Sequence, residues 1–418
     1  MAGPANAQLD VDVLVVGAGP GGSTAAYHLA RHGLDVLVAE KAAFPREKVC
    51  GDGLTPRGVV QLQRLGIDTD DPLFERHHGL RIRSRRVMLD LPWPELDDFP
   101  AYGLSMSRAS FDELLARHAE KAGARLVEET EVLGPTMNDE GWVTGARVRR
   151  VGDDAETTVR ARYVIAADGA SSRFAAKAGV ERDASKPLGI AARRYYRIEH
   201  HPGPWLEVWM GLTDRDSAMP AYGWLFALTD GSVNVGAGLL NTFANFKDLS
   251  ARGVFDVFVR ALPAEWNVNE DTAEGRMLSG PLPMGGSRTP PAMPGMLVIG
   301  DAAGLVNPFN GEGIAYAMES AELAAELVAE ALVKDRPGVA HLYPTMLRER
   351  YGAYYRIGNR FVRAIGHPRM MKALVDHGLP RKRLMGFLLR LMGNLSDRDH
   401  GDLQDRAIAT LERIARAA

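Results

Sequence analysis

The chain has 418 residues, of which 50 are Lys or Arg and 53 are Asp or Glu, and 46% are apolar. The net charge of −3 excludes the strongly basic surface of most nucleic-acid-binding proteins, so no nucleic-acid partner is expected. The single cysteine, Cys50, excludes an intrachain disulfide and a four-cysteine iron–sulfur cluster. No stretch approaches the roughly 20 apolar residues of a membrane-spanning helix. We therefore expect a cytosolic protein, or one held on the cytoplasmic side of a membrane.

The first predicted element is a buried strand over residues 11–16, followed by the turn Gly17-Ala-Gly-Pro-Gly-Gly22 and a helix over 23–31. In such a unit the first glycine permits a tight turn, and the next, Gly19, lets the backbone approach a pyrophosphate. Gly22 lets the helix pack closely on the strand. The helix directs its unpaired N–H groups at the phosphates. This segment predicts a dinucleotide-binding βαβ unit.

A second strand is predicted over 34–39, and it delivers Glu40, an acid about twenty residues after the glycines that suits a ribose diol. Two later predicted strands end in the same manner, at Asp168 and at Asp301, each next to a glycine. Three strand ends of this kind, in this order, predict an FAD-binding protein.

The predicted fold class is α/β plus α+β, with a Rossmann-type FAD domain, an antiparallel β-sheet substrate domain and a C-terminal helical region. A helix of the FAD domain is expected to begin at Ser110, with this serine as its cap. The expected parts are 10–75, 101–176 and 281–335 for the FAD domain, 76–100 and 177–280 for the substrate domain, and 336–418 for the helical region.

The C-terminal region carries an uneven charge. Between residues 360 and 395 the chain has eight basic residues and one acid, Asp376. Leu384, Leu388 and Leu391 fall on one face of a predicted helix there. Such a helix can lie in a lipid interface, or it can dock on its own protein with a solvated basic face, and the sequence favours neither.

Two histidine pairs, at 77–78 and 200–201, suggest metal binding at first sight. Each pair lies among loop-forming residues and has no third ligand at helical spacing. We therefore expect these histidines to be solvated, and we predict no metal site.

These motifs resemble those of the geranylgeranyl reductase family of flavoproteins. The resemblance covers most of residues 10–335 and includes the segments 45–54, 108–112 and 300–314. It is greatest to the family members that reduce an isoprene unit of the menaquinone side chain. It implies a fold of the p-hydroxybenzoate hydroxylase type, which aromatic hydroxylases and flavin halogenases also have.

The resemblance also implies which residues contact FAD. Glu40 would bind the adenosine ribose, Asp301 the ribityl hydroxyls and the backbone near Val132 the adenine. A helix N-terminus at Gly313 and Ile314 would face the pyrimidine ring of the flavin. The full implied set is Gly17, Gly19, Pro20, Gly21, Gly22, Glu40, Lys41, Cys50, Gly51, Arg108, Val132, Asp168, Gly169, Asp301, Gly311, Gly313 and Ile314.

Cys50, Tyr222 and Trp224 are the candidate catalytic residues. Cys50 lies in a run similar to the family's Cys-Gly-x-Gly loop beside the flavin ring. Tyr222-Gly-Trp-Leu-Phe226 resembles the family's Tyr-x-Trp-x-Phe stretch, although Ala227 replaces the proline that often follows it. Aromatic faces can stabilise a cation-like carbon. Cys50, Tyr222 or a water molecule would deliver the proton.

The implied activity is FAD-dependent reduction of an isoprenoid C=C bond, with a polyprenyl quinone or a related isoprenoid lipid as substrate. No second glycine fingerprint is present, so the electron donor would be NAD(P)H or a ferredoxin-like protein. A lipid substrate favours contact of the basic C-terminal helix with a membrane surface.

Alternative functions are a flavin-dependent monooxygenase acting on an aromatic or lipophilic compound, a geranylgeranyl lipid or diphosphate reductase, and a non-catalytic isoprenoid carrier. A halogenase is disfavoured because its Trp-x-Trp-x-Ile-Pro signature is missing.

Overall fold

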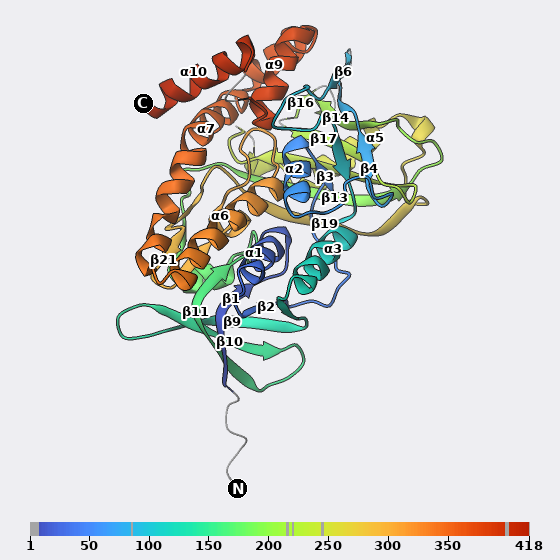
Figure 1. Cartoon of the computed structure of the whole chain (residues 1–418). Helices are drawn as coiled ribbons and strands as arrows, with labels where there is room; N and C mark the ends of the chain where they lie inside the picture. Colours follow the sequence, from blue (N-terminus) through green and yellow to red (C-terminus); the bar gives the residue numbers. More distant parts are fainter. Residues whose placement is uncertain are drawn as a thin grey trace.

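The computed structural model describes residues 8–84, 87–214, 217–219, 221–243, 246–397 and 401–417. Two sheets organise the chain, an eight-stranded sheet near the N-terminus and a seven-stranded sheet beside it, and a group of helices lies along one side (Figure 1). This arrangement confirms the predicted fold class. Residues 85–86, 215–216, 220, 244–245, 398–400 and 418, which the expected domains include, lie outside the described residues.

The eight-stranded sheet is built around β1, a strand buried on both faces because helices and further strands cover it. β1 pairs in parallel with β2 on one side and β11 on the other. The strands are β1 (Gln8–Val16), β2 (Val36–Ala39), β8 (Arg125–Val127), β9 (Thr130–Met137), β10 (Val143–Arg150), β11 (Glu156–Ala166), β21 (Ala292–Met293) and β22 (Met296–Val298).

Three helices cover this sheet, and α1 (Pro20–Arg31) lies between α3 (Arg108–Lys121) and α6 (Ile314–Val333). The predicted start of α3 was wrong. The N-cap is Ser107, whose Oγ accepts the backbone N–H of Ser110, and Ser110 is the third helical residue. Both serines suit a cap chemically, and the fold selected the earlier one.

The seven-stranded sheet has the order β19-β13-β18-β17-β14-β5-β6. All its neighbours are antiparallel except β14 and β5, which run parallel. Helix α5 (Ala251–Ala261) packs Val254, Phe255 and Phe258 against one face. The strands are β5 (Gly79–Arg83), β6 (Met88–Pro92), β13 (Leu188–Arg197), β14 (Trp205–Met210), β17 (Ala221–Ala227), β18 (Ser232–Leu240) and β19 (Ala273–Pro283).

A small sheet of β3 (Gly53–Leu54), β7 (Gly103–Ser105) and β4 (Glu75–His77) joins the two large ones. The expectation that His77 is solvated was wrong. It is fully buried on β4, its Nε2 lies 2.8 Å from Ser105 Oγ, and burial lowers its pKa to about 3. A neutral imidazole pairs with a hydroxyl here, and no cluster of metal-ligating side chains is found among the described residues.

The remaining helices are α2 (Pro56–Arg64), α4 (Arg173–Lys177), α7 (Tyr343–Ile365), α8 (Pro368–Ala373), α9 (Lys382–Gly393) and α10 (Leu403–Ala417). Helices α7, α9 and α10 lie together at the C-terminal end of the molecule (Figure 1). Within the described part of the chain, no helix is both long and apolar enough to cross a bilayer.

The contact between β1 and α1 tolerates no side chain at Gly22. A Cβ there would lie 1.9 Å from the Gly17 carbonyl oxygen. We expect Gly22→Ala to lower the free energy of unfolding by about 3 kcal/mol, because the helix must move away from the strand. Gly386→Ala on α9, where a Cβ meets nothing within 4 Å, is the control. Equal urea midpoints for Gly22→Ala and the unmodified protein would contradict this account.

Candidate active site

One cavity of about 990 Å³ connects the two large sheets. At one end its wall comes from the Gly17 turn after β1 and from Asp301. At the other end the wall comes from strands of the seven-stranded sheet and from α7 and α9, with apolar side chains such as Ile82 and Met385. The cavity therefore has a polar part and an apolar part.

The polar part is built on the glycine turn. Gly17 has a φ of +96°, and a Cβ there would lie 2.7 Å from the Ala167 carbonyl oxygen. Helix α1 begins at Pro20 with Gly19 as its N-cap, and no side chain caps its first N–H groups. The nearest atom to a Cβ at Gly19 would be Arg46 Nη2, 3.9 Å away. Free N–H groups beside open space form a cradle for a phosphate.

Four charged side chains next to this cradle neutralise one another. Glu40 accepts hydrogen bonds from the Ala18 N–H at 3.0 Å and from Arg46 at 3.1 Å. Arg46 also donates to Asp112 at 2.8 Å, and Asp112 accepts two bonds from Arg108, at 2.6 and 2.7 Å. These paired charges hold Glu40 and Arg108 at the cavity wall.

Two carboxylates on the wall have oxygen atoms that accept no hydrogen bond from a described residue. No described residue donates a hydrogen bond to the Asp301 side chain, and burial raises its pKa although Lys48 acts in the opposite direction. Asp168 accepts the Phe174 N–H at 2.8 Å through Oδ2, but its Oδ1 has no partner. Buried carboxylates are costly unless hydrogen-bonded, so these oxygens fit the hydroxyl groups of a bound cofactor.

The residues implied as FAD contacts gather on this one wall. Gly22 is the exception, because it packs against the Gly17 backbone and does not line the cavity. The residues that do line it are Gly17, Gly19, Pro20, Gly21, Glu40, Lys41, Cys50, Gly51, Arg108, Val132, Asp168, Gly169, Asp301, Gly311, Gly313 and Ile314. The phosphate cradle and the unpartnered carboxylates together fit FAD.

A buried hydrogen-bond network fixes the loop that carries Cys50. Asn234, fully buried on β18, donates to the Cys50 carbonyl oxygen at 2.8 Å and to Asp52 at 2.7 Å, and it accepts the Trp224 indole N–H at 3.0 Å. Tyr195 also donates to Asp52, at 2.6 Å. Burial raises the pKa of Asp52 to about 6 and that of the Cys50 thiol above its usual range. The thiol therefore stays protonated at neutral pH.

Three aromatic rings lie in a row on the cavity side of β17. Tyr222 and Trp224 have ring centroids 5.8 Å apart, and Trp224 and Phe226 have centroids 6.5 Å apart. Alternate residues of a strand share one face, which explains the row. A Cβ at Gly51 would lie 3.1 Å from the Trp224 indole nitrogen, so a glycine here lets the loop lie against these rings without pushing them aside.

The apolar face of α9 turns inward. Met385, Leu388 and Leu389 line the cavity, whereas Leu384, one turn before Leu388, is 40% exposed. Of the two possibilities left open by the sequence, docking on the protein holds for the part of this face that lines the cavity. Leu395 is buried beyond the end of α9.

The sequence did not identify several residues of the site. Asp52 and Asn234 were missed because their hydrogen bonds join distant segments. Thr55 and Glu312 also line the cavity. The position of Glu312, between two glycines assigned to the cofactor, was the one available signal.

The cavity and fold define a flavin-dependent oxidoreductase that binds FAD. Residues 10–219 match the FAD binding domain family. The chain is 36% identical to the menaquinone reductase of Mycolicibacterium smegmatis over 392 residues, which are 94% of this chain and 93% of that protein. It is 32% identical to digeranylgeranylglycerophospholipid reductase 1 of Methanothermobacter thermautotrophicus, over 82% of this chain and 83% of that protein.

Among solved structures, the chain is similar to a geranylgeranyl bacteriochlorophyll reductase-like protein from Thermoplasma acidophilum. The TM-score is 0.79 and the identity 26%, over 97% of this chain and 100% of that one. The chain belongs to the geranylgeranyl reductase family of FAD-dependent oxidoreductases.

A substitution of Asn234 tests whether the buried network holds the Cys50 loop in place. Asn234→Ala leaves the Trp224 N–H, the Cys50 carbonyl and Asp52 without this partner. We expect the free energy of unfolding to fall by about 2 to 4 kcal/mol, from several unmet buried groups. Tyr195→Phe removes only the hydrogen bond to Asp52 and should lower the free energy of unfolding by less. Guanidinium titrations measure both, and an Asn234→Ala variant as stable as the unmodified protein would contradict the assignment.

Proposed function

We propose that the protein reduces an isoprenoid C=C bond, and that its substrate is one isoprene unit of the menaquinone side chain. The observation that carries this proposal is the single cavity in which the FAD cradle opens into an apolar chamber, with the aromatic row of β17 on its wall. A linear hydrocarbon tail suits such a chamber.

Bound FAD, reduced by NAD(P)H or a ferredoxin-like donor, supplies the hydride. The wall of the chamber supplies the other requirements. Its apolar side chains exclude water, and the faces of Tyr222 and Trp224 stabilise positive charge at the tertiary carbon by about one to two kcal/mol. The Cys50–Gly51 loop, held by Asn234, keeps Trp224 in place. The Gly313–Ile314 helix terminus favours negative charge on the cofactor.

The menaquinone tail is preferred as substrate because the menaquinone reductase similarity extends over 94% of the chain. The second candidate is a geranylgeranyl lipid, supported by the phospholipid reductase relative. Mass spectrometry of polyprenyl quinones from host cells with and without the gene separates the two. Loss of a two-hydrogen increment on the quinone tail would support the first, and an unchanged quinone pool would reject it.

The aromatic row gives a test within the protein. We expect Trp224→Phe to retain most activity, and Trp224→Ala to lower the turnover of menaquinone by about tenfold, because the cation-like carbon loses a facing ring. Both variants should be compared at equal FAD content. Unchanged turnover in Trp224→Ala would reject a role for this ring.

We further infer that the C-terminal helices bring the protein to an anionic membrane surface. Exposed cations lie close in sequence to two exposed apolar side chains, Met370 and Leu384. Residues adjacent to these, Met371 and Met385, line the apolar part of the cavity. A tail could therefore pass from the lipid to the chamber over a short distance. The exposed cations are Arg369, Lys372, Arg381, Lys382 and Arg383.

Flotation with anionic liposomes tests this contact. We expect the protein to float at low salt, and the triple change of Arg381, Lys382 and Arg383 to Gln to abolish flotation, since each cation contributes about 1 kcal/mol near such a surface. The control variant has Arg406, Arg413 and Arg416 of α10 changed to Gln, so both variants lose three positive charges. Equal flotation of both triple variants would contradict the inferred surface.

A further inference from the structure

Reduction of a C=C bond consumes a proton as well as a hydride, and the apolar chamber must provide that proton. The two side chains expected from the sequence as proton donors, Cys50 and Tyr222, are poor acids here. Burial raises the pKa of Tyr222 to about 12 and raises that of the Cys50 thiol. A stronger acid on the cavity wall would serve better near neutral pH.

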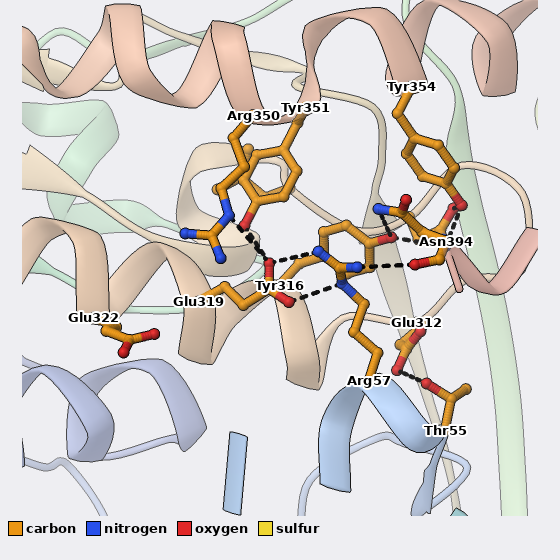
Figure 2. Close-up of polar contacts among 12 residues, drawn as sticks. Thr55, Arg57, Glu312, Tyr316, Glu319, Glu322, Arg350, Tyr351, Tyr354 and Asn394 are labelled. Atoms are coloured by element: carbon orange, nitrogen blue, oxygen red, sulfur yellow. Dashed lines mark hydrogen bonds and ion pairs between the residues drawn. The ribbon is translucent and has the colours of Figure 1, made fainter. Parts of the chain in front are cut away.

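Glu312 and Thr55 form such a group on the wall. Both line the cavity, and their side chains meet at 2.6 Å between Thr55 Oγ1 and Glu312 Oε1 (Figure 2). The other carboxyl oxygen, Oε2, is closed to solvent and has no hydrogen-bond partner among the described residues. A carboxylate in that position lacks solvation, and burial raises the pKa of Glu312 to about 7.

The Thr55 side chain does not make the hydrogen bond that is usual at its position in α2. Thr55 is the N-cap of α2, where a threonine hydroxyl commonly accepts a backbone N–H of the first turn. Its side chain makes no capping bond, and the hydroxyl is turned to Glu312. The Thr55 hydroxyl therefore holds the Glu312 carboxyl group and does not stabilise the helix as a cap.

The pair lies where the flavin part and the substrate part of the cavity meet. A Cβ at Gly311 would be 3.1 Å from the Tyr222 hydroxyl, and a Cβ at Gly313 would be 3.1 Å from Asp301 Oδ1. Of the two neighbours of Glu312 in the chain, Gly311 therefore lies next to the aromatic row and Gly313 lies next to Asp301, a proposed ligand of FAD.

We propose that Glu312 and Thr55 are the acid that protonates the alkene, an assignment that rests on the proposed prenyl reduction. The Thr55 hydroxyl gives its proton to one alkene carbon as it takes the proton of Glu312. The hydride from reduced FAD forms the other C–H bond, so the two alkene π electrons and the hydride pair give two C–H bonds. Glu312 is left as a carboxylate and regains a proton from solvent between turnovers.

The charges around Glu312 remain constant near neutral pH. Arg57 lies beside it on α2, and burial disfavours its charge, but its buried ion pair with Glu319 at 2.7 Å keeps its pKa high (Figure 2). Burial also acts against ionisation of Glu319, yet Arg57 and Arg350 hold its pKa below the usual range. Burial raises the pKa of Tyr316. Asp52, in the Cys50 loop, titrates lower, because burial raises its pKa only to about 6. The titration near pH 7 is therefore assigned to Glu312.

The first measurement needs no substrate. The infrared C=O band of a protonated carboxyl group should disappear from the FAD-loaded protein as the pH rises through about 7. Glu312→Gln should lack this band and keep the Asp52 band, which disappears nearer pH 6. Glu322→Gln, on the solvent side of α6 and paired with Arg64, is the control and should keep both bands. An unchanged band near pH 7 in Glu312→Gln would overturn the proposal.

The second measurement isolates proton delivery. The bound FAD is reduced with dithionite and mixed anaerobically with menaquinone in detergent, and flavin reoxidation and the reduced tail are followed. We expect Glu312→Gln and Thr55→Val to slow this step by about 100-fold or more at normal FAD content, and Thr55→Ser to restore it. In the unmodified protein the rate should be constant below pH 7 and fall about tenfold per pH unit above it.

The outcomes separate the two proposals. Failure of the unmodified protein to reduce the tail, with the infrared titration intact, rejects the menaquinone substrate and leaves Glu312 as the buried acid of the cavity. A normal rate in Glu312→Gln or in Thr55→Val rejects the proton-delivery role while prenyl reduction stands.

Discussion

The cavity of this protein must hold charged groups and a water-excluding chamber within one continuous wall, and this constraint explains much of the structure. An unpaired charge at such a wall would cost several kcal/mol. The protein meets the constraint in two ways. Near the phosphate cradle, Arg46 and Arg108 are paired with Glu40 and Asp112. Toward the chamber, burial raises the pKa of Asp52 and of Glu312, which favours their neutral forms.

The same constraint accounts for the way in which the two large sheets are joined. The Cys50 loop crosses from the FAD part to the seven-stranded sheet, and its polar backbone would be unsatisfied against aromatic rings. Asn234 supplies the missing partner and at the same time binds the Trp224 indole. Glycines at 51 and 53 let the loop approach Trp224 and Phe226 closely. One amide side chain thereby fixes both the loop and the ring that faces it.

Helix α6 connects this site to the C-terminal helices. Its first residue, Ile314, lines the cavity, and further along, Glu319 forms the buried ion pair with Arg57 and accepts a hydrogen bond from Tyr351 of α7 at 2.7 Å (Figure 2). A buried ion pair adds little net stability over apolar packing, but breaking one partner is costly. This pair therefore ties α2, α6 and α7 into one arrangement, and α7 and α9 complete the apolar wall.

The sequence alone determined the FAD-binding fold, because the phosphate cradle is local. A buried strand, Gly17, Gly19 and a helix are adjacent in the chain, and their spacing specifies the geometry. It also determined the family, through motifs that each lie within one short segment. Only the tertiary structure decided what depends on contacts between distant segments. Thr55 meets Glu312 across 257 residues, and Asn234 meets Cys50 across 184. The packing of α9 against the cavity and the burial of His77 could not be predicted from the sequence either. Periodicity shows that a helix has an apolar face, but it does not show which part of the protein packs against that face.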